Sequence, residues 1–155
     1  MKTIIAILIA LFSTCTINAQ TTYTLDQLVG TKWRIIFPER IENDPYSSHS
    51  KKIDFSLSEI HTNYKRIIKE TGEVNANISY SKPYYLSNAI PQSFDHTKVG
   101  KVQKGSYIIL YNNKINRMEY FYIKTLTKDK LVLYHKRDYK DMDDDECTLY
   151  YERVK

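Results

Sequence analysis

The sequence predicts an all-β protein, an antiparallel up-and-down β-barrel of about eight strands with a short N-terminal helix. The 155 residues include 14 tyrosines but only four glycines and four prolines, and tyrosine suits half-buried pleated surfaces. The apolar residues occur in short runs bounded by turn residues. The predicted strands do not alternate with helices, which argues against a parallel sheet. A meander of this many strands hides its edges completely when it closes into a barrel.

The first segment has the features of a secretory signal peptide. Lys2 precedes an apolar run from Ile4 to Phe12, and the small residue Ala19 follows at the expected cleavage site. We therefore expect residues 1–19 to be removed and residues 20–155 to form one domain that is periplasmic or secreted. As a helix the apolar run is too short for the ~30 Å bilayer core, and no later segment is apolar enough to span it. Cys15 leaves a lipoprotein anchor as an alternative.

One helical turn is expected at the start of the domain. Thr24 to Gln27 has the Thr-x-x-Gln spacing of a capping box, and Gly30 is placed to end the helix. The first strand then runs from Thr31 to Phe37 and stops at Pro38. A polar loop that includes residues 47–50 precedes the second strand, in which Ile53, Phe55 and Leu57 alternate with polar residues.

The remaining strands are predicted from apolar runs between turn signals. Pro83 is expected to separate two of them, residues 91–104 are polar enough to form a loop, and Asn112-Asn113 suits a tight hairpin. The predicted segments are Ile60–Ile68, Val74–Ser81, Tyr84–Leu86, Gly105–Tyr111, Met118–Leu126, Leu131–His135 and Cys147–Val154.

Four segments give the chain a recognisable pattern. They are Leu28-Val29-Gly30-Thr31-Lys32-Trp33, the strand from Gly105 to Ile109, the hairpin from Tyr120 to Leu133 and the terminal Leu149-Tyr150-Tyr151-Glu152-Arg153-Val154. In these segments the chain resembles the lipocalin-like domains of exported bacterial proteins. Its Gly30 to Trp33 spacing is one residue longer than the Gly-x-Trp of lipocalins. The resemblance implies a ligand-binding barrel closed at one end by an arginine stacked on a tryptophan, here Arg153 over Trp33.

The net charge and the positions of the histidines limit the classes of function that the sequence predicts. The 23 basic and 18 acidic residues give a net charge of +5, spread over both signs, and together with export this predicts no nucleic-acid partner. His49, His61, His96 and His135 lie in separate segments without a Gly-x-Ser-x-Gly turn, so we expect no enzyme and no cofactor.

Metal binding is not expected either. The acidic residues between Asp141 and Glu146 are of the type that Ca²⁺ prefers, but their spacing does not fit an EF-hand, and a solvated hairpin tip is the better interpretation. Cys147 is the one cysteine left after cleavage, which rules out an internal disulfide and favours a small buried side chain.

The tyrosines on adjacent strands predict the lining of the barrel. Either they fill the core or they surround a ligand, since an eight-stranded barrel is just wide enough for one small ligand. We expect non-catalytic binding of a small hydrophobic or amphipathic molecule; a cell-envelope protein–protein interaction module with a filled barrel is the alternative. Alternation alone selects the ligand-binding candidates, and a shift of one residue exchanges the whole set. These candidates are Phe55, Tyr107, Ile109, Tyr120, Tyr122 and Leu133.

Overall fold

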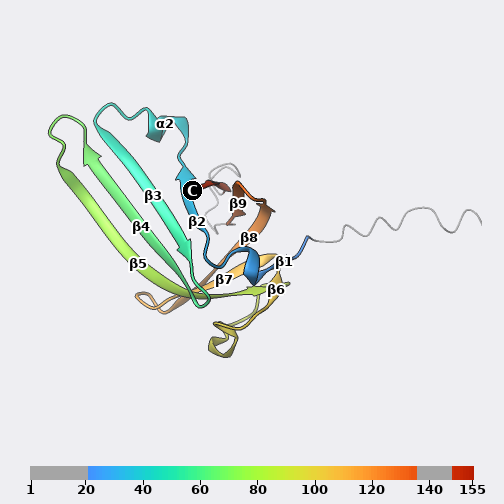
Figure 1. The fold of residues 1–155 in the computed structure, drawn as a ribbon. Coiled ribbons are helices and arrows are strands. Elements are labelled where there is room, and N and C mark those ends of the chain that lie inside the picture. The colour runs from blue at the N-terminus through green and yellow to red at the C-terminus, as the bar shows by residue number, and fades with distance from the viewer. Residues whose placement is uncertain (1–20, 136–147) are drawn as a thin grey trace, which may run out of the picture.

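The chain folds as a closed antiparallel barrel. The computed structural model describes residues 21–135 and 148–155, and its eight barrel strands follow the order β10-β2-β3-β4-β5-β7-β8-β9 (Figure 1). Each barrel strand pairs with the next barrel strand along the chain, and β10 returns to pair with β2. The predicted all-β class and eight-stranded up-and-down barrel are therefore confirmed.

The strands differ considerably in length. β3, β4, β5 and β8 are the long ones, with 9, 10, 14 and 10 residues. β3, β4 and β5 lie side by side and extend beyond the rest of the barrel (Figure 1). Two short strands outside the barrel, β1 (Tyr23–Thr24) and β6 (Lys104–Gly105), pair with each other. The barrel strands are β2 (Lys32–Ile36), β3 (Ser47–Phe55), β4 (Glu59–Ile68), β5 (Val74–Ser87), β7 (Tyr107–Asn112), β8 (Arg117–Leu126), β9 (Lys130–Tyr134) and β10 (Thr148–Arg153).

The predicted N-terminal helix is a single 3-10 turn, η1 (Leu25–Gln27). The Thr24 amide donates to Gln27 Oε1 at 2.8 Å, as the capping-box spacing suggested. Gly30 then adopts a φ of +75°, and its amide donates to the Phe55 carbonyl. The chain thereby joins the barrel before a longer helix can form. The other short helices are α2 (Glu39–Glu42) and η2 (His96–Lys98); within the described ranges, no helix has the length and hydropathy needed to cross a membrane.

Two predicted boundaries are wrong. Residues 47–50 belong to β3 instead of a loop, because residues 65–68 of β4 pair with them. Pro83 does not break the chain into two strands, since β5 continues through it to Ser87. Pro83 is the last residue of β5 to pair with β4, and pairing with β7 starts at Tyr84. The missing proline amide therefore falls where β5 changes partners.

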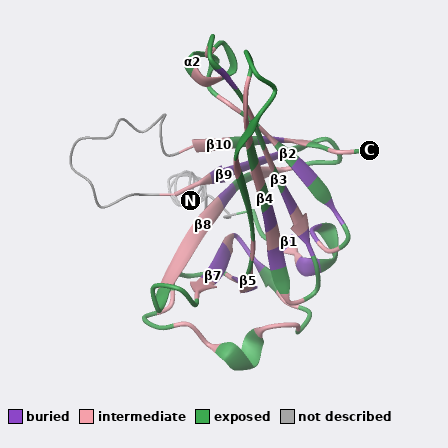
Figure 2. Cartoon of the chain, turned by 90° about the vertical axis from the view of Figure 1, so that its left-hand side faces the viewer, coloured by how far each residue is buried: buried purple, intermediate pink, exposed green. Residues whose placement is uncertain are grey.

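The hydrophobic core closes one end of the barrel. Leu25 and Leu28 of the N-terminal segment are 1% and 0% exposed and cluster with Trp33, Tyr84 and other buried side chains. Figure 2 shows that buried residues gather in the barrel body, whereas α2 and the hairpin tips beside it are largely exposed. The expected signal peptide with Cys15, the acidic run 141–146 and Cys147 lie outside the described residues.

Candidate functional site

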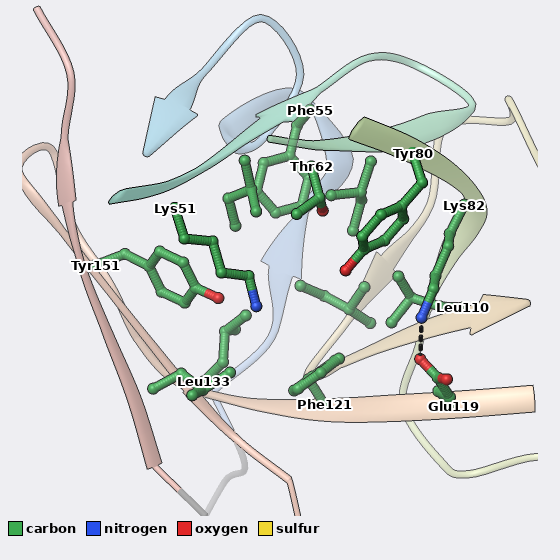
Figure 3. Close-up of a pocket in the computed structure, with 14 residues that line it drawn as sticks. Lys51, Phe55, Thr62, Tyr80, Lys82, Leu110, Glu119, Phe121, Leu133 and Tyr151 are labelled. Atoms are coloured by element: carbon green, nitrogen blue, oxygen red, sulfur yellow. Dashed lines mark hydrogen bonds and ion pairs between the residues drawn. The ribbon is translucent and has the colours of Figure 1, made fainter. Parts of the chain in front are cut away.

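A cavity of about 70 Å³ lies inside the barrel (Figure 3). Seven of the eight barrel strands contribute to its wall, so the site exists only when the barrel is closed. Eight apolar side chains form most of the lining, and six polar ones complete it. The apolar residues are Ile53, Phe55, Ile60, Ile108, Leu110, Phe121, Leu133 and Leu149, and the polar ones are Lys51, Thr62, Tyr80, Lys82, Glu119 and Tyr151.

The structure brings two of the six predicted ligand-binding residues to this cavity. Phe55 and Leu133 line it and are 2% and 4% exposed. The other four, Tyr107, Ile109, Tyr120 and Tyr122, are not part of the lining. Their immediate neighbours on β7 and β8 form the wall instead, and successive side chains of a strand point to opposite faces. The prediction was therefore one residue out of register on these two strands.

The outer face of β7 and β8 is apolar because it has its own cover. Tyr107 pairs with Tyr122 at a ring-centroid distance of 5.4 Å. Ile109 pairs with Tyr85, and both are buried, at 0% and 1% exposure. Phe94, from the segment between β5 and β6, lies 5.1 Å from the Tyr85 ring. With large residues on both faces, alternation could not tell the inside of these strands from the outside.

Sequence reasoning missed the six polar residues of the lining. Lys51 lies two and four residues before Ile53 and Phe55, and Lys82 lies two residues before Tyr84 on its strand. Extending the alternation backward from the apolar residues would have placed both lysines inside. They were missed because lysine is expected at the surface and because the strand around Lys51 was expected to start later.

An ion pair crosses one side of the cavity. Lys82 Nζ lies 2.5 Å from Glu119 Oε2 (Figure 3). Asn112 Nδ2 donates to Glu119 Oε1 at 3.0 Å. Burial alone would raise the pKa of Glu119, but the hydrogen bonds from Lys82 and Asn112 outweigh burial and keep the pKa below its usual value. Glu119 is therefore an ionised acceptor whose two oxygens are both engaged.

Further hydrogen-bond donors from β3, β5 and β10 face the cavity. Figure 3 shows the Lys51 amino group and the Tyr80 and Tyr151 hydroxyls directed into the space between the strands. Tyr151 is 2% exposed. Burial raises the pKa of its phenol, and nearby Tyr80 raises it further. Tyr151 thus remains a neutral hydroxyl donor at physiological pH.

Trp33 and Arg153 meet at the closed end. The two residues pair across β2 and β10, and Arg153 Cζ lies 5.7 Å from the centroid of the Trp33 ring. Trp33 is fully buried, and its indole Nε1 donates to Thr31 Oγ1 at 2.6 Å. The guanidinium thus lies over the face of the indole at the closed end of the barrel.

A second hollow, of about 540 Å³, opens in the barrel wall. β2 and β3 pair over three residues, Lys32 to Arg34 with Asp54 to Lys52, and then diverge. The hollow fills the resulting wedge and is lined by apolar residues of β2 and α2 and polar residues of β3. These include Ile35, Ile36, Phe37, Ile41, Ser48, His49 and Ser50.

Beside this wedge the structure joins a serine, a histidine and a carboxylate. Ser47 Oγ lies 3.0 Å from His49 Nε2, and His49 Nδ1 lies 2.8 Å from the Tyr64 hydroxyl. Ser47 donates its own proton to Asp44 Oδ2. In a nucleophilic triad the serine hydroxyl donates a hydrogen bond to one ring nitrogen of the histidine. The carboxylate accepts a hydrogen bond from the other ring nitrogen. Here the carboxylate itself accepts the hydrogen bond from the Ser47 hydroxyl, and Ser47 is 1% exposed. This arrangement does not match the order of a triad.

The described residues form no metal centre. Within residues 21–135 and 148–155, no group of three histidine, cysteine, aspartate or glutamate side chains is arranged to hold a metal ion. Comparisons with protein-family models, curated proteins and solved structures find no match for this chain. The interior cavity, with its mostly apolar wall and its polar side chains, is the candidate site.

Proposed function

We propose that this chain is an exported, lipocalin-like protein that binds a small amphipathic molecule inside its barrel and leaves it chemically unchanged. The observation that carries the proposal is the composition of the cavity wall, where eight apolar side chains stand beside six polar ones. Binding sites for small molecules combine an apolar lining with a few placed polar groups in this way. The signal peptide that the sequence predicts at residues 1–19 supports a site of action outside the cytoplasm.

The cavity volume limits the ligand. At about 70 Å³, the cavity has room for roughly five to seven water-sized groups, since one water needs about 10–15 Å³ of such space. A long-chain lipid does not fit in this space. The proposal is therefore narrower than the sequence suggested, because it favours a compact molecule with one polar end.

The test compares binding by the protein with binding by a variant whose cavity is filled. Leu133→Phe adds volume to the lining, whereas Val132→Ile adds volume to the opposite face of the same strand. Calorimetric titration with a panel of compact amphipathic molecules should detect at least one saturable ligand. We expect Leu133→Phe to weaken its affinity about tenfold or more and Val132→Ile to leave it within about threefold. Equal affinities for the two variants would place binding outside the cavity.

The small cavity also favours a second candidate, an envelope interaction module with a filled barrel. Ligand pockets commonly enclose about 300–1,000 Å³, and the outer surface exposes Tyr46, Val102 and Ile115 at 78%, 71% and 61%. Native mass spectrometry of the freshly purified protein separates the two functions. A bound small mass supports the ligand-binding function, and an unliganded protein that carries a stoichiometric protein partner supports the interaction module.

A further inference from the structure

Two tyrosines reach into the cavity from opposite walls of the barrel. Tyr80 lies on β5 and Tyr151 on β10. In the closed order β10-β2-β3-β4-β5-β7-β8-β9, three strands separate β5 from β10 in either direction around the barrel. Both residues line the cavity, and Figure 3 shows their hydroxyl groups directed into the same space. The two phenols therefore face one volume.

Neither hydroxyl has a hydrogen-bond partner within the part of the chain that the structure describes. Other tyrosines of the barrel differ in this respect, since the Tyr84 hydroxyl donates to the Ser56 carbonyl at 2.8 Å. Tyr151 is 2% exposed, so its hydroxyl is largely withdrawn from bulk water. A buried hydroxyl without a partner costs free energy, and a ligand that accepts its hydrogen bond removes that cost.

The charged groups of the lining already interact within the protein. Lys82 and Glu119 form an ion pair with each other. Lys51 interacts within the protein as well, so we assign it no part in holding a ligand. A neutral ligand leaves these contacts in place and meets the uncharged polar residues of the lining. These are Thr62, Tyr80 and Tyr151.

The number of free donors suits a carbonyl oxygen. Each phenol has one O–H to donate, and a carbonyl oxygen has two lone pairs, so one such oxygen can accept from Tyr80 and Tyr151 together. Burial raises the pKa of the Tyr151 phenol, which therefore keeps its proton. An alcohol would bring an O–H of its own, and the one carboxylate of the lining, Glu119, already accepts from Lys82 and Asn112.

We infer that the cavity binds a compact neutral carbonyl compound, whose oxygen accepts hydrogen bonds from Tyr80 and Tyr151. The hydrocarbon body of the ligand lies against the apolar wall, which includes Phe55 and Leu133. This inference rests on the proposed function and specifies the class of its ligand. The cavity volume of about 70 Å³ suits a molecule of roughly five to seven non-hydrogen atoms.

The test uses two probes of the same shape. The first is methyl isopropyl ketone, and the second is its methylidene analogue, an alkene in which a CH₂ group replaces the carbonyl oxygen. Each is titrated into the full chain, and the shifts of the backbone amide NMR signals give its dissociation constant. We expect the ketone to bind saturably and to shift the amides of lining residues such as Phe55 and Leu133.

Three tyrosine variants locate the hydrogen bonds. Tyr151→Phe and Tyr80→Phe each remove a cavity hydroxyl and keep the ring, and each should weaken the ketone about tenfold through the loss of one hydrogen bond. Both should leave the alkene within about twofold. Tyr150→Phe is the matched control at the 43% exposed position next to Tyr151, and it should change neither affinity. Comparing variants with one probe at a time cancels the different hydration of the two probes.

The stability of the unliganded protein gives a second readout. Because the Tyr151 hydroxyl has no partner in the fold, Tyr151→Phe should melt at or above the temperature of the parent, which also shows that the variant is folded. Saturating ketone should raise the melting temperature of the parent more than that of Tyr151→Phe. An unliganded Tyr151→Phe protein that melts below the parent would mean that the hydroxyl serves the fold, contrary to the inference.

The outcomes separate the inference from the function on which it rests. If Tyr151→Phe leaves the ketone affinity unchanged, or weakens ketone and alkene equally, the carbonyl inference is wrong while binding in the barrel stands. If neither probe binds, native mass spectrometry of the freshly purified protein decides. A retained carbonyl compound supports the inference, a retained small molecule without a carbonyl group overturns the inference alone, and a protein that retains no small molecule overturns the proposed function.

Discussion

Gly105 shows how a single backbone contact fixes the path of the chain. A Cβ atom at this position would lie 2.4 Å from the backbone nitrogen and oxygen of Ser87. The next amide, of Ser106, donates to the Ser87 carbonyl at 3.1 Å, and the Ser106 carbonyl accepts from Ile123. Glycine is therefore required here by close backbone approach, where β6 leads into β7 against the end of β5.

Gly105→Ala should destabilise the protein by about 1–3 kcal/mol, because the methyl group forces β6 away from β5. Urea denaturation followed by circular dichroism measures the loss. Lys104→Ala is the matched control, since Lys104 is the exposed partner residue in the same two-residue strand, and it should stay within about 0.5 kcal/mol of the parent. A Gly105→Ala protein as stable as the parent would contradict the close approach of the two backbones.

The lysines of the cavity mark the limit of residue-level prediction. The sequence places Lys51 and Lys52 side by side, and only the register of β3 decides that Lys51 lines the cavity while Lys52 is exposed. Phe55 could be predicted because polar residues alternate with it. The contact between Lys82 and Glu119 could not be predicted from the sequence, because it depends on the pairing registers of β5 with β7 and of β7 with β8.

At the scale of elements, hydrogen bonds to Asp44 stabilise the corner between α2 and β3, residues 43–47. Its Oδ1 accepts from the Tyr46 amide at 2.8 Å, and its Oδ2 accepts from the Ser47 hydroxyl. Its carbonyl accepts from Lys69 Nζ at 2.5 Å, which links the corner to the end of β4. The hydrogen bonds from Ser47 and Tyr46 lower the pKa of the Asp44 carboxyl below its ordinary value of 3.8.

The lowered pKa of Asp44 predicts that the stability of the folded protein depends on pH. Because the pKa of Asp44 is lower in the folded than in the unfolded state, its contribution is complete above the unfolded value near 3.8 and is lost as pH falls through the folded value. Asp44→Asn should therefore lower the melting temperature at pH 7, and the difference from the parent should shrink as pH falls below 3.8. Melting curves between pH 7 and pH 2 measure it.

Asp54→Asn is the control for the Asp44 prediction, since it removes one carboxylate near the far end of β3 and leaves the α2–β3 corner intact. A difference between Asp44→Asn and the parent that stays constant over the whole pH range would exclude the carboxylate as its source.

The elements also show why strand boundaries were harder to predict than strand number. Residues 47–50 are polar and were expected to be loop, yet β4 supplies backbone partners for all of them. Pro83 is a local breaker whose effect disappears because β5 changes neighbours there. In both cases tertiary pairing decides what local propensity cannot.

At the scale of the whole molecule, the meander could be predicted because each strand pairs with its sequence neighbour. The turn signals at Thr71-Gly72 and Asn112-Asn113 lie between paired strands, and hiding the sheet edges requires closure. The cavity could not be predicted, since seven strands contribute its wall and each must be in the right register. A slip of one residue on β7 and β8 was enough to exchange tyrosines for Ile108, Leu110 and Phe121.

Closure of the barrel depends on the pairing of its first and last strands. β10 pairs with β2 from Tyr150–Ile36 to Arg153–Trp33, and the Arg153 guanidinium covers the indole at the end of this seam. Arg153 is exposed, so its cation–π contact should contribute about 0.5–1 kcal/mol. Its backbone amide also donates to the Asp129 carbonyl, which holds the β8–β9 turn against the same end.

Arg153→Ala should therefore lower the melting temperature by roughly 2–4 °C. Trp33 is the single tryptophan and is 0% exposed, so its fluorescence reports closure directly, and its emission should shift to the red at temperatures where the variant opens. Lys155→Ala, which removes a terminal positive charge away from the indole, should melt like the parent. If Arg153→Ala also melts like the parent, the seam is held by strand pairing alone and the arginine has no part in closing the barrel.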